Sequence, residues 1–250
     1  MRYINLTLFS ALVALLIVLP IAFTDGNLSN SQSPWHLQPF GANSLSKFYK
    51  ENYRIYGEQA LVDLLRDSTK TTVSVLIDGW GVPYDEEMLK QDFAYFENNS
   101  PEYAVHKRVF NYTVFAEGNE LQKDFAGGLF IYGGPDSVCS GKRNRFGSLF
   151  SRIECCDNCG DLKITSLLDS VLAERSWTRI ALTTCQTRKG DRDSLHLVLS
   201  KLSEISKKYK DVQFVIQGTH RPILGTPETR RKYLAPWVPA VFLNSRMKKD

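Results

Sequence analysis

Several short, uninterrupted apolar runs, each followed by glycine or polar residues, constrain the fold of this chain most strongly. Continuous runs of this length are typical of strands that are buried on both faces of a sheet. They lie at Val73–Ile77, Leu129–Tyr132, Arg179–Leu182, Val212–Ile216 and Val241–Leu243. Helical spacing occupies residues 46–66, Glu86–Glu97, Thr165–Glu174 and Ser194–Tyr209, with Asp193 as the expected N-cap of the last helix. This alternation predicts an α/β fold, with a mostly parallel sheet and helices on both faces.

The N-terminal segment is strongly apolar, because Tyr3–Phe23 contains no charged residue. About 20 residues are enough to cross the hydrocarbon core of a bilayer. We therefore predict a single-pass membrane anchor in residues 1–25, with Arg2 holding the N-terminus in the cytosol. A cleaved signal peptide is the alternative. Both readings place the rest of the chain outside the cytosol, as a linker and helix in residues 26–70 and an α/β domain in residues 71–245.

Composition and motifs limit the classes of partner that this domain is expected to bind. The chain has 250 residues and a formal net charge of +4, without a nucleic-acid-binding motif, so we predict no nucleic-acid partner. Basic residues cluster in Lys142–Arg145 and Arg230–Lys232, where they either bind phosphate or anionic lipid or are simply solvated. Cys156 and Cys159 have the CxxC spacing, but the sequence offers no second ligand pair for structural zinc. A loop disulfide is the expected form, which an extracytoplasmic location allows.

Groups suited to catalysis follow the predicted strands. In open α/β sheets, ligands bind beyond the carboxyl ends of the strands. The polar groups expected there are Asp78, Cys139, Ser140, Asp191, Asp193 and His220. Together they predict a divalent metal and a nucleophile at one edge of the sheet.

Each of these residues also has a simpler interpretation. Asp78 precedes a glycine and suits a turn, and Asp193 suits a helix cap. Asp191 can pair with a neighbouring arginine, and Cys139 can be buried or disulfide-bonded. Asn111-Tyr112-Thr113 has the form of a glycosylation acceptor.

The order of these motifs resembles the alkaline phosphatase and sulfatase superfamily over residues 71–245. Asp78-Gly79-Trp80-Gly81 is similar to the acidic turn that begins the domain in such proteins, and Cys139–Arg143 keeps the Cys and Arg of the sulfatase nucleophile motif. Gly218-Thr219-His220 and Trp237–Phe242 are similar to the late histidine motif and the strand that follows it. Thr219 stands where the family has a metal-binding Asp.

The resemblance implies a set of roles. Metal ligands would be Asp78, Asp191, Asp193 and His220, holding Zn, Mn, Mg or Ca. Cys139, converted to formylglycine, or else Ser140, would be the nucleophile, and Arg143 would hold the anionic group. Thr219 lacks a carboxylate's charge, so we expect weaker binding of a hard divalent cation.

Two functions are consistent with these roles. The first is a membrane-anchored, extracytoplasmic, metal-dependent hydrolase or transferase acting on phosphate or sulfate esters of envelope lipids or glycans. The second is a non-catalytic relative that binds an anionic glycan or a protein partner in the same cleft. Its binding residues would be Arg143, Arg188, Arg192, Arg221 and Arg230.

Overall fold

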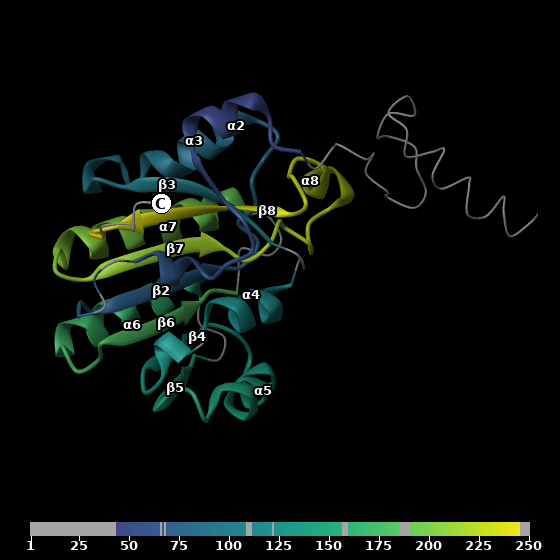
Figure 1. Ribbon diagram of the computed structural model, residues 1–250. Coiled ribbons are helices and arrows are strands. Elements are labelled where there is room, and N and C mark those ends of the chain that lie inside the picture. The colour runs from purple at the N-terminus through teal and green to yellow at the C-terminus, as the bar shows by residue number, and fades with distance from the viewer. Residues whose placement is uncertain are drawn as a thin grey trace, which may run out of the picture. The chain divides into compact units, whose positions relative to one another are not determined.

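One sheet of eight strands organises the part of the chain that the structure describes (Figure 1). The computed structural model describes residues 44–65, 67, 69–108, 112–121, 123–156, 160–185 and 191–245. The predicted anchor and most of the predicted linker lie outside these ranges. Within the ranges, no helix is both long and apolar enough to cross a bilayer.

The strand order across the sheet is β1-β3-β8-β7-β2-β6-β4-β5. Neighbouring strands run parallel except at β8, which is antiparallel to both β3 and β7. The bounds are β1 Arg54–Tyr56, β2 Thr72–Ile77, β3 Glu102–Lys107, β4 Leu129–Tyr132, β5 Arg152–Cys155, β6 Arg179–Thr183, β7 Gln213–Gly218 and β8 Trp237–Leu243. The predicted α/β class and mostly parallel sheet are thereby confirmed.

Helices lie between these strands in the chain. The α-helices are α2 Lys47–Asn52, α3 Glu86–Ala94, α4 Thr113–Glu120, α5 Asp136–Phe146, α6 Asp161–Glu174, α7 Arg192–Lys208 and α8 Pro227–Arg231. Short 3-10 turns are η1 Leu61–Leu64, η2 Glu97–Asn99 and η3 Lys123–Phe125. In Figure 1, α4 and α8 lie at the edge of the sheet where the arrowheads of β6 and β7 end.

Two apolar cores cover the two faces of the sheet, and strand alternation divides residues between them. Val75 of β2 packs in the core that contains α3, α6 and α7. The next residue, Leu76, packs in the other core, with η1 and α5. Because successive side chains point to opposite faces, both faces of a central strand must be apolar. This requirement explains why the central strands can be recognised in the sequence as continuous apolar runs.

Some predicted elements differ from the structure. A single helix over residues 46–66 is wrong, because the segment forms α2, then β1, then η1. The prediction also missed β1, β3 and β5, which are short or carry charged residues at their ends. The N-cap of α7 is Asp191 rather than Asp193, since the Asp191 side chain accepts a hydrogen bond from the Asp193 backbone N–H.

Candidate functional site

Two loops meet at the carboxyl edge of the sheet, one after β2 and one after β7. A Cβ atom on Gly218 would lie 1.8 Å from the carbonyl oxygen of Trp80, and one on Gly81 would lie 2.7 Å from the Cα of Arg221. The two backbones can therefore approach this closely only because these positions carry no side chain. The Thr219 N–H donates to the carbonyl oxygen of Ile77 at 3.0 Å, which fixes the two loops together.

This close approach brings Asp78 and His220 into contact. Asp78 Oδ1 lies 2.7 Å from His220 Nε2, and both side chains are almost fully buried. The hydroxyl of Thr113, the first residue of α4, donates to Asp78 Oδ1 at 2.7 Å and lies 3.1 Å from His220 Nε2. Thr219 adds a second hydroxyl, 3.3 Å from Asp78 Oδ1. Thr113 is half-buried, whereas Asp78 and His220 are buried.

The hydrogen bonding of His220 indicates what these atoms can hold. Nδ1 lies 2.6 Å from the Arg221 carbonyl oxygen, which can only accept, so Nδ1 carries a proton. In the neutral ring, Nε2 then presents a lone pair toward the Asp78 carboxylate. Two electron-pair donors at 2.7 Å require a hydrogen or a cation between them, that is, a proton on one of the two atoms or a cation bound by both groups.

The donor set fits one divalent cation of the kind that accepts mixed oxygen and nitrogen ligands. Asp78, Thr113, Thr219 and His220 supply a carboxylate, two hydroxyls and an imidazole. In the described ranges, no group of three or more His, Cys, Asp or Glu side chains is placed to hold a metal. A cation at this point would therefore depend on the hydroxyls, and it would meet a single carboxylate charge.

Buried ion pairs hold α4, and thus Thr113, in place. Arg108 donates to Glu120 of α4 at 2.9 Å and to Gln217 of β7 at 2.6 Å. Lys142 of α5 pairs with Glu117, one helical turn after Thr113. Burial raises the pKa of Glu117, although Lys142 opposes the shift. These contacts tie the helix to β7 and to α5, which preorganises its first residue.

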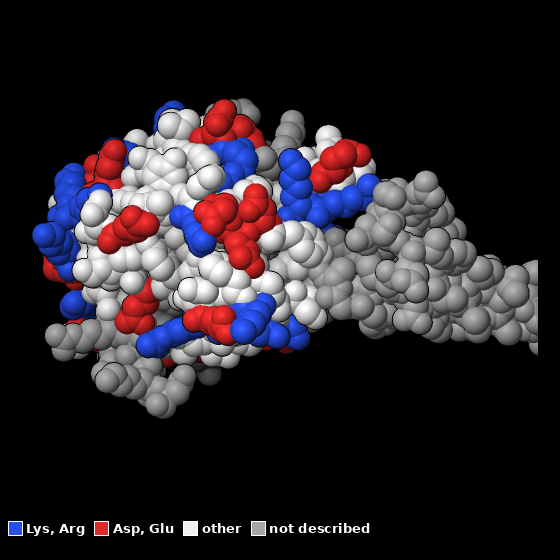
Figure 2. All heavy atoms as spheres, turned by 90° about the horizontal axis from the view of Figure 1, so that it is seen from above, with Lys and Arg blue, Asp and Glu red and all other residues white. Residues whose placement is uncertain are grey.

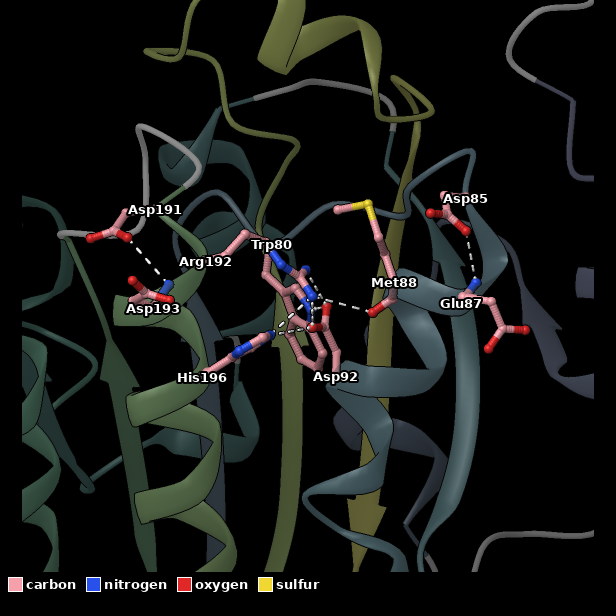
Figure 3. A network of polar contacts seen from close by, with 9 residues as sticks. All are labelled: Trp80, Asp85, Glu87, Met88, Asp92, Asp191, Arg192, Asp193 and His196. Carbon is pink, nitrogen blue, oxygen red and sulfur yellow. Dashed lines mark hydrogen bonds and ion pairs between the residues drawn. The ribbon is translucent and has the colours of Figure 1, made fainter.

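A second polar network supports the loop after β2 (Figure 3). The Trp80 indole N–H donates to the buried carboxylate of Asp92 at 3.0 Å. The Asp92 carboxylate also forms an ion pair with Arg192 at 2.6 Å and lies 3.2 Å from His196 Nε2. Arg192 and His196 both belong to α7. Asp92 thus connects the glycine-rich loop to α3 and α7, so we regard the network as structural support for the loop that carries Asp78.

Arginines lie next to this centre. Burial lowers the pKa of Arg221, which directly follows His220; the Tyr84 hydroxyl opposes the shift, and the charge of Arg230 adds to it. The Arg230 side chain donates to the Ile223 carbonyl oxygen at 3.3 Å. The Arg230 guanidinium therefore lies beside the loop that carries Arg221.

The structure brings together two of the predicted site residues, Asp78 and His220. Asp191 and Asp193 are exposed at the start of α7, where the Asp191 carboxylate accepts from Asp193 N–H (Figure 3) and also from the Ser194 hydroxyl. These hydrogen bonds lower the pKa of Asp191. Asp191 therefore acts as a helix cap, which differs from the metal-ligand role that the resemblance implied.

The predicted nucleophiles lie on α5. Cys139 is fully buried and forms a disulfide with Cys155, so it offers no thiol for conversion to formylglycine. Ser140 and Arg143 are exposed on the same helix. The hydroxyl that contacts Asp78 and His220 belongs instead to Thr113, which the sequence analysis treated only as part of a glycosylation triplet. A threonine shortly after a strand and at the start of a helix was the available signal, and it was missed because β3 was not recognised as a strand.

Comparison with solved structures identifies the fold. A protein in the alkaline phosphatase superfamily from Vibrio parahaemolyticus matches with a TM-score of 0.50 and 13% identity, over 72% of this chain and 61% of that one. The lipoteichoic acid synthase LtaP from Listeria monocytogenes gives a TM-score of 0.49 and 10% identity, over 70% and 65%. The C-terminal periplasmic domain of EcEptC from Escherichia coli gives 0.47 and 10%, over 72% and 74%.

The first of these matches shows that this chain has the fold of the alkaline phosphatase superfamily, which confirms the predicted resemblance at that level. The chain spans less than two thirds of each of the first two structures. No protein-family model matches the sequence, and no curated protein sequence matches it either.

Proposed function

We propose that this domain is a hydrolase or transferase of phosphate or sulfate esters, with the hydroxyl of Thr113 as its nucleophile. One observation supports the proposal most strongly: Thr113 Oγ1 lies within hydrogen-bond distance of both Asp78 Oδ1 and His220 Nε2. A hydroxyl is a weak nucleophile until an adjacent base or cation removes its proton. Here it is the partly exposed member of a cluster whose other members are buried.

The arrangement of α4 also suits an anionic ester. Thr113 is the first residue of an eight-residue helix, so the positive end of the helix dipole faces a group bound there. The Thr113 oxygen would form a bond to phosphorus or sulfur as the bond to the leaving oxygen breaks, while Asp78 or His220 accepts the Thr113 proton. Attack on the resulting ester of Thr113 by water gives hydrolysis, and attack by another hydroxyl gives transfer.

Asp78, His220, Thr113 and Thr219 would hold the divalent cation implied by the fold. Such an ion lowers the pKa of a bound hydroxyl and stabilises charge that develops on the ester oxygens. Zn, Mn, Mg and Ca remain the candidates. Because Thr219 contributes no charge, we propose that the affinity for the ion is modest and that Asp78 dominates it.

The location of the domain follows from its cysteines and from the N-terminal segment. The disulfide between Cys139 and Cys155 is typical of proteins in oxidising compartments. We propose that Tyr3–Phe23 anchors the chain and holds the domain outside the cytosol. The substrates would then be anionic esters of envelope lipids or glycans, since the anchor confines the domain near the membrane.

Activity of the full chain in detergent on aryl phosphates and aryl sulfates tests the proposal. Thr113→Val keeps the shape of the side chain and removes the nucleophile, so we expect a loss of about 10³-fold or more. Thr113→Ser should restore part of the activity. Thr165→Val is the control, because it also removes a threonine hydroxyl from a helix, one that is buried in α6 and donates to the Leu162 carbonyl oxygen. Equal rates for Thr113→Val and Thr165→Val would refute Thr113 as the nucleophile.

A non-catalytic, anion-binding relative is the second candidate, and Thr219 favours it because it leaves Asp78 as the single carboxylate of the centre. Purified protein that binds phosphate but turns over neither ester with any of the four metals would support this function. Binding that survives both chelation and Asp78→Ala would show that the ligand does not use the metal ligands.

A further inference from the structure

Beside the candidate site lies a pair of arginines for which the proposed mechanism has no role. The Nε atom of Arg221 is fully buried, and among the described residues it has no hydrogen-bond acceptor. Buried donors in native proteins normally have a partner, so such a group calls for an acceptor that arrives with a ligand. The Arg221 backbone is fixed, because it packs directly on Gly81.

Arg230 adds a second positive charge beside the loop that carries Arg221. Its guanidinium is oriented by the Ile223 carbonyl oxygen, and α8 is held to the loop after β2 because Tyr84 N–H donates to the Lys232 carbonyl oxygen at 2.7 Å. In the described part of the chain, no carboxylate pairs with Arg221 or Arg230 at ion-pair distance. Glu228 lies near Arg230, but it is exposed and therefore screened by water.

The surface around Arg230 is also positively charged. Arg231 and Lys232 are exposed next to Arg230. Figure 2, the view from above, shows Lys and Arg side chains gathered at the α8 end of the domain, with acidic side chains beside them. Planar guanidinium groups bind phosphate-type oxyanions through paired N–H donors, whereas an isolated, half-buried guanidinium pair is electrostatically unfavourable.

We propose that Arg221 and Arg230 bind a second phosphate-type oxyanion next to the Thr113–His220 centre. Arg221 directly follows His220, so the oxyanion lies at the edge of the catalytic site. If the proposed function holds, this oxyanion site would select esters that carry a further phosphate. Only this role in specificity rests on the proposed function. The same chemistry would also accept the headgroup of an anionic lipid.

Calorimetric titration of inorganic phosphate into the full chain in detergent tests the site. The Thr113→Val background separates binding from turnover. Arg221→Gln and Arg230→Gln should each weaken binding at least tenfold. Arg231→Gln, which removes the same charge from an exposed position of α8, should change it less than twofold. Thermal unfolding checks that each variant is folded, and Arg221→Lys replaces Arg221→Gln if that variant is not.

Equal weakening by Arg231→Gln would overturn the proposal, because the effect would then be general electrostatics. Unchanged binding in both Arg221→Gln and Arg230→Gln would also overturn it. If wild-type protein shows no turnover but binding depends on the two arginines, the proposed function fails and the anion site stands.

Two further measurements distinguish the source of the oxyanion. For a substrate phosphate, Arg221→Gln raises KM more for an ester with a second phosphate than for an aryl phosphate. For a lipid headgroup, bilayers of phosphatidylcholine with phosphatidylglycerol weaken phosphate binding relative to phosphatidylcholine alone, and Arg221→Gln abolishes the difference.

Discussion

Replacing Thr219 by aspartate tests whether the two loops form a cation site. The Thr219 hydroxyl lies 3.3 Å from Asp78 Oδ1, so Thr219→Asp places a second carboxylate beside the first in a buried position. At an effective dielectric constant of ~20, two such charges repel by about 5 kcal/mol, an upper limit because the pair can share a proton. For a domain of this size, the melting temperature in chelator should fall by up to about 15 °C.

A bound cation should offset the loss of stability that the second carboxylate causes in Thr219→Asp. An ion that binds only the folded state at a hundred times its Kd adds about 2.7 kcal/mol of stability. We therefore expect Mn²⁺ or Zn²⁺ to raise the melting temperature of Thr219→Asp more than that of the wild type, as measured by scanning calorimetry with and without chelator. Ser206→Asp is the control, since it buries a carboxylate in α7 beside Asn99 and Ser203 and should gain nothing from metal. Equal responses of Thr219→Asp and Ser206→Asp to metal would refute a cation site at Asp78.

Further predictions concern stability. Lys142→Met leaves the buried Glu117 carboxylate without its partner and should cost about 3–5 kcal/mol, whereas Lys142→Met with Glu117→Leu should be close to neutral, which urea unfolding can measure. His106 is buried and neither ring nitrogen has a hydrogen-bond partner among the described residues, so burial lowers its pKa from 6.5 to about 2. The unfolded chain therefore binds the proton that the folded chain excludes, and stability should fall by about 1.4 kcal/mol per pH unit below pH 6.5. Urea unfolding of His106→Leu between pH 7 and pH 5 should show a flatter dependence than the wild type, and parallel curves would contradict the assignment. Gly218→Ala should cost about 3 kcal/mol or more and lower activity, because its methyl group would collide with the Trp80 carbonyl oxygen; unchanged unfolding in urea would contradict the close loop contact.

Part of the site could be predicted because it depends on strand ends. The buried strands before Asp78 and His220 are continuous apolar runs, and parallel neighbours bring their carboxyl ends to one edge. These are local properties of the sequence, so the sequence could place Asp78 and His220 at the same edge. Their direct contact depends on β2 and β7 being neighbours in the sheet, which the sequence did not predict.

The remaining features depend on tertiary contacts that no local pattern reveals. β3 is antiparallel to β8 and carries Glu102 and Lys107 at its ends, so its sequence does not resemble a buried strand. Without β3, the start of α4 was not recognised as the end of a strand–helix connection, and Thr113 was overlooked. Cys139 was assigned by motif order, whereas its pairing with Cys155 depends on β5 lying beside β4.

The most direct test of the account is the location of the covalent intermediate. The full chain, incubated with an aryl phosphate and quenched in acid within the first turnover, is digested and sequenced by mass spectrometry. We predict one phosphoryl group on Thr113, absent from Thr113→Val. Turnover with the phosphoryl group on another residue, or turnover that persists in Thr113→Val, would contradict the assignment of Thr113 as the nucleophile.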